Sequence, residues 1–167
     1  MRIEPVDPAR YEQPIVAAYT SAYRGLEEYA YREPADVVRY LRWLWRRCPD
    51  GLLVAFDNHR PVGLIACDPT WNAPEEPDLG ELHEFFVASE SQGRGIGRAL
   101  FEAGLRFLTE RGCRRYALWV GEGNVGAQRM YERYGFRKQG QVGVWVRMER
   151  AEPWEPAGSL GGACTPR

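Results

Sequence analysis

A glycine-rich run between a predicted strand and a predicted helix constrains this sequence most. Residues 92–97 read Gln-Gly-Arg-Gly-Ile-Gly. The apolar, aromatic residues 82–87 predict a strand, and residues 98–108 have helical spacing. Glycines let a backbone approach a ligand closely, and the first-turn amides of a helix lack partners inside it. Because the helix dipole favours negative charge there, the run predicts an anion site, and phosphate is the expected ligand.

Two common phosphate-binding loops do not fit this run. A Walker A loop ends in Gly-Lys-Ser/Thr, whereas the only lysine in the chain is Lys138. The dinucleotide fingerprint needs a third glycine where the chain has Arg98, and it belongs in the first strand–helix unit of a domain. What remains is Gln-x-x-Gly-x-Gly, with Arg94 and Arg98 on and beside the loop.

A second segment, residues 124–136, follows a predicted strand at 116–120. Asn124 is a good helix N-cap, and Gly135 suits the position that ends the helix. One face of this helix carries Ala127, Met130, Tyr131 and Tyr134.

Together the two segments resemble the GNAT superfamily of acyl-CoA-dependent N-acetyltransferases. The family's phosphate loop, Gln/Arg-x-x-Gly-x-Gly/Ala, is matched by Gln92, Gly95 and Gly97. Its later motif, Asn-x-x-Ala-x-x-x-Tyr-x-x-x-Gly-Phe, is matched by Asn124, Ala127, Tyr131, Gly135 and Phe136. The close resemblance covers about residues 79–149, and the first half matches in element order.

The order of predicted elements fits the family. The expected strands are 1–6, 52–56, 62–67, 82–87, 116–120, 136–141 and 143–149, and the expected helices are 8–23, 34–47, 95–111 and 124–134. The resemblance implies an α/β fold of the α+β type, in which helices flank a mixed, mostly antiparallel, twisted sheet whose central fourth and fifth strands splay apart. We expect one domain over residues 1–150 and a disordered tail over the proline- and glycine-rich residues 151–167.

The composition limits the classes of binding partner that we expect for this protein. A net charge of −1 gives no bulk attraction to nucleic acid. No run of 18 apolar residues and no signal peptide is visible, so the sequence predicts a cytoplasmic protein without a membrane partner. The four cysteines are scattered and there are two histidines, which predicts reduced thiols and no metal site. Whether the chain forms a homodimer is left open.

The resemblance implies acetyl-CoA as the acyl donor, bound in the notch between the splayed strands. The backbone of the strand ending at Val87 would pair with pantetheine, and the Val87 amide would donate to the thioester oxygen. Asn124 would bind the cofactor from the other wall. The phosphate loop would hold pyrophosphate through Gln92, Gly93, Arg94, Gly95, Ile96, Gly97 and Arg98.

The chemistry then needs a general acid and a general base. An amine with a pKa of ~10.4 is on the order of one part in a thousand free base at pH 7, so something must take its proton. The departing thiolate benefits from a proton donor, and Tyr131 stands where the family keeps its catalytic tyrosine. The structural alternative is that Tyr131 only packs its helix onto the sheet.

Candidates for the base lie on the fourth strand. The family often uses a residue four or six positions before the one matching Val87, which here gives His83 and Glu81. Strict alternation places both on the side of Val87 and Glu84 on the other. A water relay is a further alternative. Trp119 occupies the fifth-strand position where ribosomal-protein-type enzymes have a glutamate, which argues against a protein N-terminus as the acceptor.

The predicted acceptor is a small-molecule or peptide amine. Aromatic candidates for lining its pocket are Tyr23, Tyr29, Tyr31, Trp71, Trp119 and Trp145, and candidate acids are Glu27, Glu28, Glu75, Glu76 and Asp78. Two other classes compete with an enzyme: a non-catalytic acyl-CoA sensor on the same fold, and a nucleotide-binding module. The latter requires a magnesium ligand set that the sequence near the loop does not offer.

Overall fold

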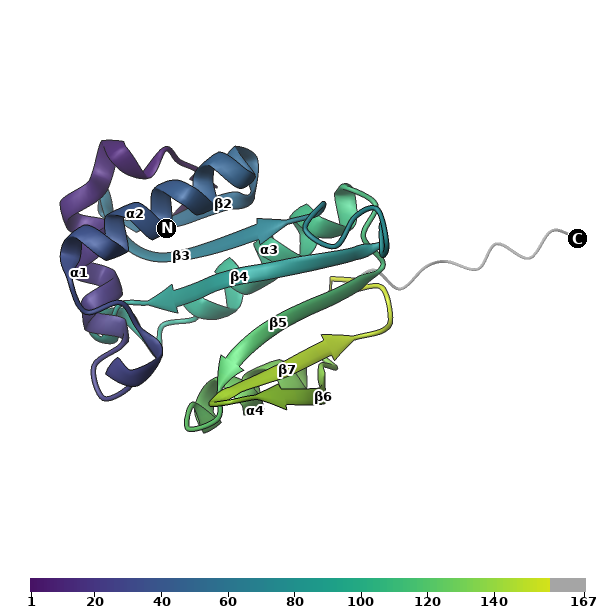
Figure 1. Ribbon diagram of the computed structural model, residues 1–167. Coiled ribbons are helices and arrows are strands. Elements are labelled where there is room, and N and C mark those ends of the chain that lie inside the picture. Colours follow the sequence, from purple (N-terminus) through teal and green to yellow (C-terminus); the bar gives the residue numbers. More distant parts are fainter. Residues whose placement is uncertain (157–167) are drawn as a thin grey trace, which may run out of the picture.

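The computed structural model describes residues 1–156, which contain a seven-stranded sheet in the order β1-β2-β3-β4-β5-β7-β6 (Figure 1). Neighbouring strands are antiparallel except for β4 and β5, which confirms the predicted mixed, mostly antiparallel sheet flanked by helices. The strands are β1 Arg2–Pro5, β2 Leu52–Asp57, β3 Arg60–Asp68, β4 Leu79–Val87, β5 Arg115–Gly121, β6 Arg137–Val142 and β7 Trp145–Arg150. The helices are α1 Glu12–Ala22, α2 Pro34–Arg47, α3 Ile96–Glu110 and α4 Val125–Arg133.

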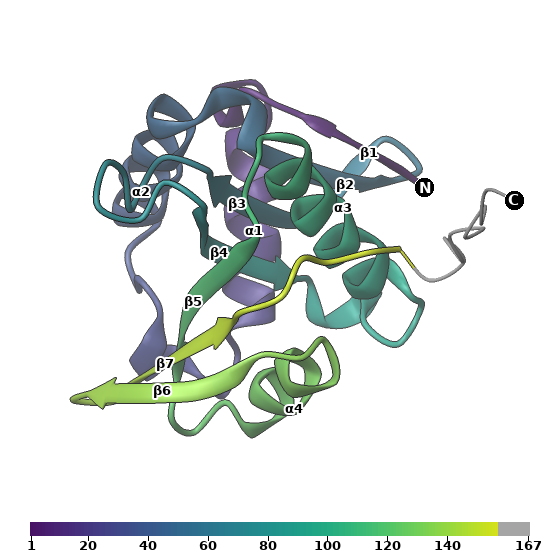
Figure 2. The same cartoon turned by 90° about the vertical axis from the view of Figure 1, so that its right-hand side faces the viewer.

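Two hydrophobic cores lie on opposite faces of the sheet. Helices α1 and α2 cover one face, and α3 and α4 cover the other (Figure 2). Side chains alternate along β2, so Leu52 and Val54 pack with α1 and α2, whereas Leu53 and Ala55 pack with α3. Helix α4 contributes Tyr131 to the α3 core. The first half of the chain therefore covers one face of the sheet, and the two motif-bearing helices belong to the other.

The paired region between β4 and β5 is short. Only Leu79–Leu82 pair with Arg115–Leu118, and beyond these residues the two strands separate (Figure 1). The remaining five residues of β4 have no strand neighbour on that side. The sheet thus opens into the V that the resemblance implied, with α3 behind one arm and α4 behind the other.

A β-bulge in β4 breaks the alternation that the sequence predicted. Ala66 of β3 pairs with Glu84, and Cys67 pairs with Leu82, so His83 is the extra residue. Val87 packs in the α3 core, whereas the His83 ring contacts Trp43 of α2. The prediction that His83 and Val87 share a side is therefore wrong, because a bulge re-aims the side chains beyond it and leaves no mark in an alternation pattern.

Two element boundaries also differ from prediction. Asn58 and His59 adopt positive φ angles of 47° and 66°, so the β2–β3 hairpin turns in two residues and its strands run longer than expected. The expected helix start at residue 8 is instead a 3-10 turn, Pro8–Tyr11, and α1 begins at Glu12.

The predicted tail begins too early. Trp154 is buried in the α3 core, and its amide donates to the Tyr116 hydroxyl at 3.1 Å. The Arg150 guanidinium donates to the carbonyls of Glu152 and Pro153. The proline- and glycine-rich composition of the segment led to a prediction that did not take account of the apolar Trp154. The rest of the predicted tail, 157–167, lies outside the described residues.

Candidate active site

A cavity of about 950 Å³ occupies the V between β4 and β5. This volume is at the upper end of the usual range for ligand sites. Both halves of the chain contribute walls: the α1–α2 region, the end of β4, the glycine-rich loop, β5 and α4. Residues predicted for the site that line the cavity are His83, Val87, Gln92, Gly93, Gly95, Gly97, Arg98, Asn124 and Tyr131.

The open edge of β4 presents a backbone amide that has no hydrogen-bond partner among residues 1–156. The Ala88 amide donates to the Val62 carbonyl of β3 at 2.9 Å. Because successive residues of a strand point their backbone groups to opposite edges, the amide and carbonyl of Val87 face the opening. Gln92 Nε2 donates to that carbonyl at 3.0 Å. Gln92 therefore anchors the loop to the strand end, and the Val87 amide is left for a ligand.

The glycine-rich loop is shaped for an anion. Gly93 and Gly95 have φ angles of +73° and +80°, and no atom lies within 4 Å of where a Cβ would be at either residue. Gly95 precedes α3 without any side-chain cap. Within residues 1–156, none of the amides of residues 93–98 donates to a carbonyl or side chain. These N–H groups converge at the positive end of a helix dipole.

The other predicted cofactor residues play different parts. Arg94 pairs with Asp57 (2.8 Å) and is not part of the cavity wall. Arg98 lines the cavity and pairs with Glu102 (2.9 Å). The Ile96 side chain is buried in the core, so only its amide faces the loop. Asn124 lies on the opposite wall.

Asn124 also shapes the wall on which it lies. Its side-chain oxygen accepts from the Ala127 amide at 3.2 Å and caps α4. The residue lines the cavity from the β5 arm, facing the glycine-rich loop across the opening.

Glu84 places a buried carboxyl in the cavity. It is 7% exposed, and it accepts from the Tyr23 hydroxyl at 2.7 Å and from the Phe85 amide at 3.1 Å. Burial raises the pKa of Glu84 to about 7. Both protonation states are therefore populated at neutral pH, which suits a group that takes up and releases a proton.

Tyr131 faces the same cavity from α4. Its ring packs against Phe101 and Phe136, with centroid separations of 5.5 Å and 6.0 Å. Burial raises the pKa of the Tyr131 hydroxyl well above its usual value, with the nearby Glu84 carboxyl adding to the effect. The hydroxyl stays protonated at neutral pH and can act as a proton donor.

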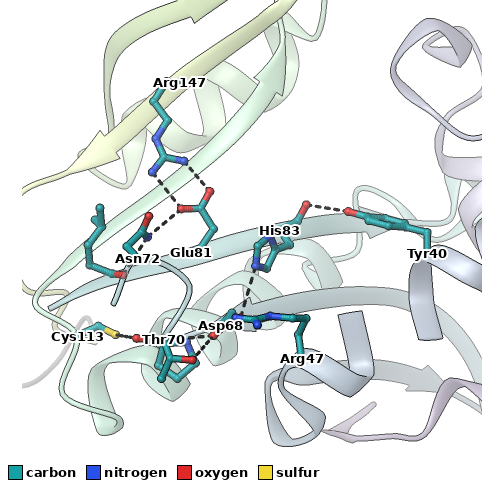
Figure 3. Close-up of polar contacts among 11 residues, drawn as sticks. Tyr40, Arg47, Asp68, Thr70, Asn72, Glu81, His83, Cys113 and Arg147 are labelled. Atoms are coloured by element: carbon teal, nitrogen blue, oxygen red, sulfur yellow. Dashed lines mark hydrogen bonds and ion pairs between the residues drawn. The ribbon is translucent and has the colours of Figure 1, made fainter. Parts of the chain in front are cut away.

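Glu81 forms an ion pair with Arg147 outside the cavity (Figure 3). It is 2% exposed, and both of its oxygens are bound by the Arg147 guanidinium, at 2.6 Å and 3.0 Å. Asn72 Nδ2 adds a third contact at 3.3 Å. Arg147 belongs to β7, so this pair ties β4 to the far arm beside the point where β4 and β5 part.

His83 lies on the cavity wall, and its imidazole is held among aromatic rings (Figure 3). The ring meets Trp71 and Trp43 edge-on, at centroid separations of 4.7 Å and 5.8 Å. Its Nε2 has no hydrogen-bond partner within the described part of the chain and lies 3.9 Å from the buried Asp68 carboxylate.

Some of the residues predicted to bind the acceptor line the cavity, and others lie outside it. Tyr23, Tyr29, Tyr31, Trp119 and Trp145 line the cavity, whereas Trp71 does not. Of the acids, Glu28 lines it, while Glu76 and Asp78 pair with Arg115. Sequence reasoning missed Tyr19 and Tyr40, which also line it. Both lie on apolar helix faces, where the sequence pattern predicts that an aromatic residue is part of the hydrophobic core.

Residues 1–156 contain neither a metal-binding cluster nor a helix that could span a membrane. No cluster of three or more His, Cys, Asp or Glu side chains within residues 1–156 is arranged to hold a metal ion. None of the helices in this range combines the length and the apolar character that a membrane crossing requires.

Comparison with known proteins decides the family. The model of the "Acetyltransferase (GNAT) family" matches residues 15–136 of the chain. The chain belongs to the GNAT acetyltransferase family. This match confirms the resemblance carried by the two motifs.

Individual relatives of this GNAT chain agree with that assignment. An uncharacterized N-acetyltransferase of Methanocaldococcus jannaschii is 40% identical over 131 residues, which is 78% of this chain and 58% of the relative's length. PH1933 from Pyrococcus horikoshii OT3, known from a crystal structure, is 38% identical in sequence to this chain. The two structures superpose with a TM-score of 0.79 over 89% of this chain and 96% of that one. The PaiA N-acetyltransferase of Thermoplasma acidophilum, solved with coenzyme A, shares the fold at 17% identity, with a TM-score of 0.73 over 89% of this chain and 97% of that one.

We expect Arg147→Met to destabilise this GNAT chain by about 3–5 kcal/mol, because it leaves the Glu81 carboxylate buried without its cation. The measurement is the free energy of unfolding in urea. In the double variant Glu81→Gln/Arg147→Met the charge is gone, and more than half of the lost stability should return. Equal stability of the single variant and the wild type would show that the pair has no structural role.

Proposed function

We propose that this chain transfers an acetyl group from acetyl-CoA directly to a primary amine, with both substrates bound at once. The proposal depends on the position of the Val87 amide, which lies on the open edge of β4. Val87 lines the same cavity as Gly93, Gly95, Gly97 and Arg98, whose amides have no partner within residues 1–156. One ligand that has both a pyrophosphate and an extended arm ending in a carbonyl group fits both sets of donors.

Each part of acetyl-CoA has a counterpart in the cavity. The pyrophosphate takes the amides of residues 93–98, and Arg98 adds positive charge beside them. Pantetheine runs along the open edge of β4, and the Val87 amide donates to the thioester oxygen. That donor stabilises the negative charge on the oxygen during attack. Asn124 contacts the cofactor from the β5 arm. The coenzyme A bound to the PaiA enzyme of the same fold supports this choice of ligand.

We assign the proton transfers to Glu84 and Tyr131. Glu84 takes a proton from the acceptor ammonium, directly or through a water molecule. The free amine attacks the thioester carbon, the C–N bond forms and the C–S bond breaks. Tyr131 donates its hydroxyl proton to the departing CoA thiolate, and the resulting tyrosinate takes up the second proton of the acylated nitrogen, so that the products are a neutral amide and the CoA thiol. Glu81 has no part in these steps, because Arg147 holds its charged form outside the cavity.

On charge and hydropathy we further propose a cytoplasmic protein that acts on a small-molecule or peptide amine, without a nucleic-acid or membrane partner. The direct test is release of free thiol from acetyl-CoA across a panel of amines. Thiol release that depends on the amine supports the enzyme. Stabilisation by CoA without turnover of any amine would favour a sensor, and no response to CoA would overturn the proposal.

Gly95→Glu should abolish CoA binding, because it places a carboxylate against the pyrophosphate and forces a side chain onto a residue with positive φ. The measurement is the rise in melting temperature on adding CoA. Gly112→Glu is the matched control, because Gly112 also has a positive φ (+91°), has no atom within 4 Å of its Cβ position and does not line the cavity. A normal CoA response in Gly95→Glu would contradict the loop assignment.

Glu84→Gln should lower kcat by about a hundredfold at pH 8, and it should change the pH profile. Glu84 acts as its carboxylate, and with a pKa of about 7 that form is lost as the pH falls below 7. The substrate amine titrates equally in both proteins. The ratio of wild-type to variant kcat should therefore rise from pH 6 to pH 8 and then level off.

The control for this experiment is Glu81→Gln/Arg147→Met, which removes the other buried glutamate of β4. It should keep the wild-type pH profile. A ratio for Glu84→Gln that does not change with pH would reject Glu84 as the base.

Tyr131→Phe should lower kcat by about a hundredfold or more while leaving the KM for acetyl-CoA nearly unchanged, because it removes a proton donor and keeps the ring. Tyr134→Phe, at the end of the same helix, loses a hydroxyl that only donates to Glu102 and should lose far less activity. Equal losses of turnover and affinity in Tyr131→Phe would instead indicate a packing role.

A further inference from the structure

Five tyrosines form the wall at the acceptor end of the cavity, and the hydroxyls of four of them already have partners in the protein. Tyr19, Tyr23, Tyr29, Tyr31 and Tyr40 line it, all from α1, α2 and the segment between them. The Tyr23 hydroxyl donates to Glu84, and the Tyr40 hydroxyl donates to the His83 carbonyl at 3.2 Å. Those of Tyr19 and Tyr29 accept from the amides of Tyr31 and Gly123, at 3.1 Å and 2.8 Å. What the cavity receives from these four residues is chiefly ring surface.

The opposite wall is also aromatic. Trp119 of β5 and Trp145 of β7 line the cavity and remain 44% and 39% exposed. Tyr29 reaches across from the α1–α2 connection and meets Trp145 edge-on, with ring centroids 5.6 Å apart. Its ring lies so close over Gly121 that a Cβ there would come within 2.6 Å of it. An edge-on aromatic contact thus joins the first half of the chain to the β5–β7 arm at this end of the cavity.

Apart from the solvent-exposed Arg24, the charges at this end are acidic or already paired. Glu84 lies in the cavity, and Glu28 lines it farther out. Arg147, beside Trp119, has its guanidinium occupied by Glu81 and Glu149. Arg24 is a cation on this wall, and it is solvent-exposed. A carboxylate on the acceptor would therefore lose its hydration next to Glu84 without gaining a buried cation.

We propose that the acceptor is a primary amine carried on a compact aromatic group without a carboxylate, that is, an arylalkylamine. This inference rests on the proposed acetyl transfer and names its substrate class. The ammonium meets Glu84, and the ring packs between the tyrosines of the first half and the tryptophans of the β5 and β7 strands. Ring faces also attract the ammonium itself.

Three matched acceptors test the proposal. 2-Phenylethylamine has both the ring and the amine, ethylamine lacks the ring, and phenylalanine adds a carboxylate. We expect kcat/KM for 2-phenylethylamine to exceed that for each of the other two by about tenfold or more. Spermidine and a peptide with a free N-terminus complete the set, and both should be poorer than 2-phenylethylamine.

Variants locate the preference in the aromatic wall. Trp145→Ala should reduce the ratio of kcat/KM for 2-phenylethylamine to that for ethylamine by about fivefold to tenfold, with the rise in melting temperature caused by CoA unchanged. Trp71→Ala is the matched control, because Trp71 is similarly exposed (43%) and does not line the cavity. Its ratio should equal that of the wild type.

The outcomes separate this inference from the proposed function. Turnover of amines without a preference for 2-phenylethylamine, or a faster reaction with spermidine, phenylalanine or the peptide, would overturn the substrate class and leave acetyl transfer standing. An equal fall of the ratio in Trp71→Ala and Trp145→Ala would overturn the location of the ring. Absence of thiol release with every amine would overturn both proposals.

Discussion

The site depends on one interruption in backbone pairing. After Leu82, β4 no longer pairs with β5, and each backbone group facing that edge must find another partner. Side chains supply partners for three of these groups: the Tyr40 hydroxyl binds the His83 carbonyl, the Glu84 carboxyl binds the Phe85 amide, and Gln92 binds the Val87 carbonyl. The Val87 amide faces the cavity. The residues that satisfy this edge are also the ones that shape the site.

Two glutamates on β4 show how neighbouring groups determine whether a buried carboxyl can act as a proton acceptor. Glu81 and Glu84 are both almost fully buried. Arg147 binds both oxygens of Glu81, so its negative charge is compensated. Glu84 has hydroxyl and amide donors in place of a cation, and burial raises the pKa of its carboxyl to about 7. A proton acceptor that works at neutral pH needs the second kind of environment.

The sequence predicted the parts of the site that are local in the chain. The glycine-rich loop, the start of α3 and the N-cap at Asn124 follow from residue types at fixed spacing, and the structure has them at the expected places. What it could not predict depends on contacts between distant segments. The Glu81–Arg147 pair joins residues 66 positions apart. The bulge at His83 depends on the register with β3, and the places of Tyr19 and Tyr40 depend on how α1 and α2 sit against the open strand.

The short paired region between β4 and β5 has a consequence for the whole sheet. Four residue pairs link β4 to β5, whereas six register pairs link β5 to β7. Each arm has its own helix, and the cavity lies between the two arms. If acetyl-CoA binds as proposed, its pantetheine arm occupies that space and uses the backbone edge of β4 as a neighbouring strand would. The cofactor then completes the sheet, so that the substrate of one turnover is, while bound, also a structural element of the protein.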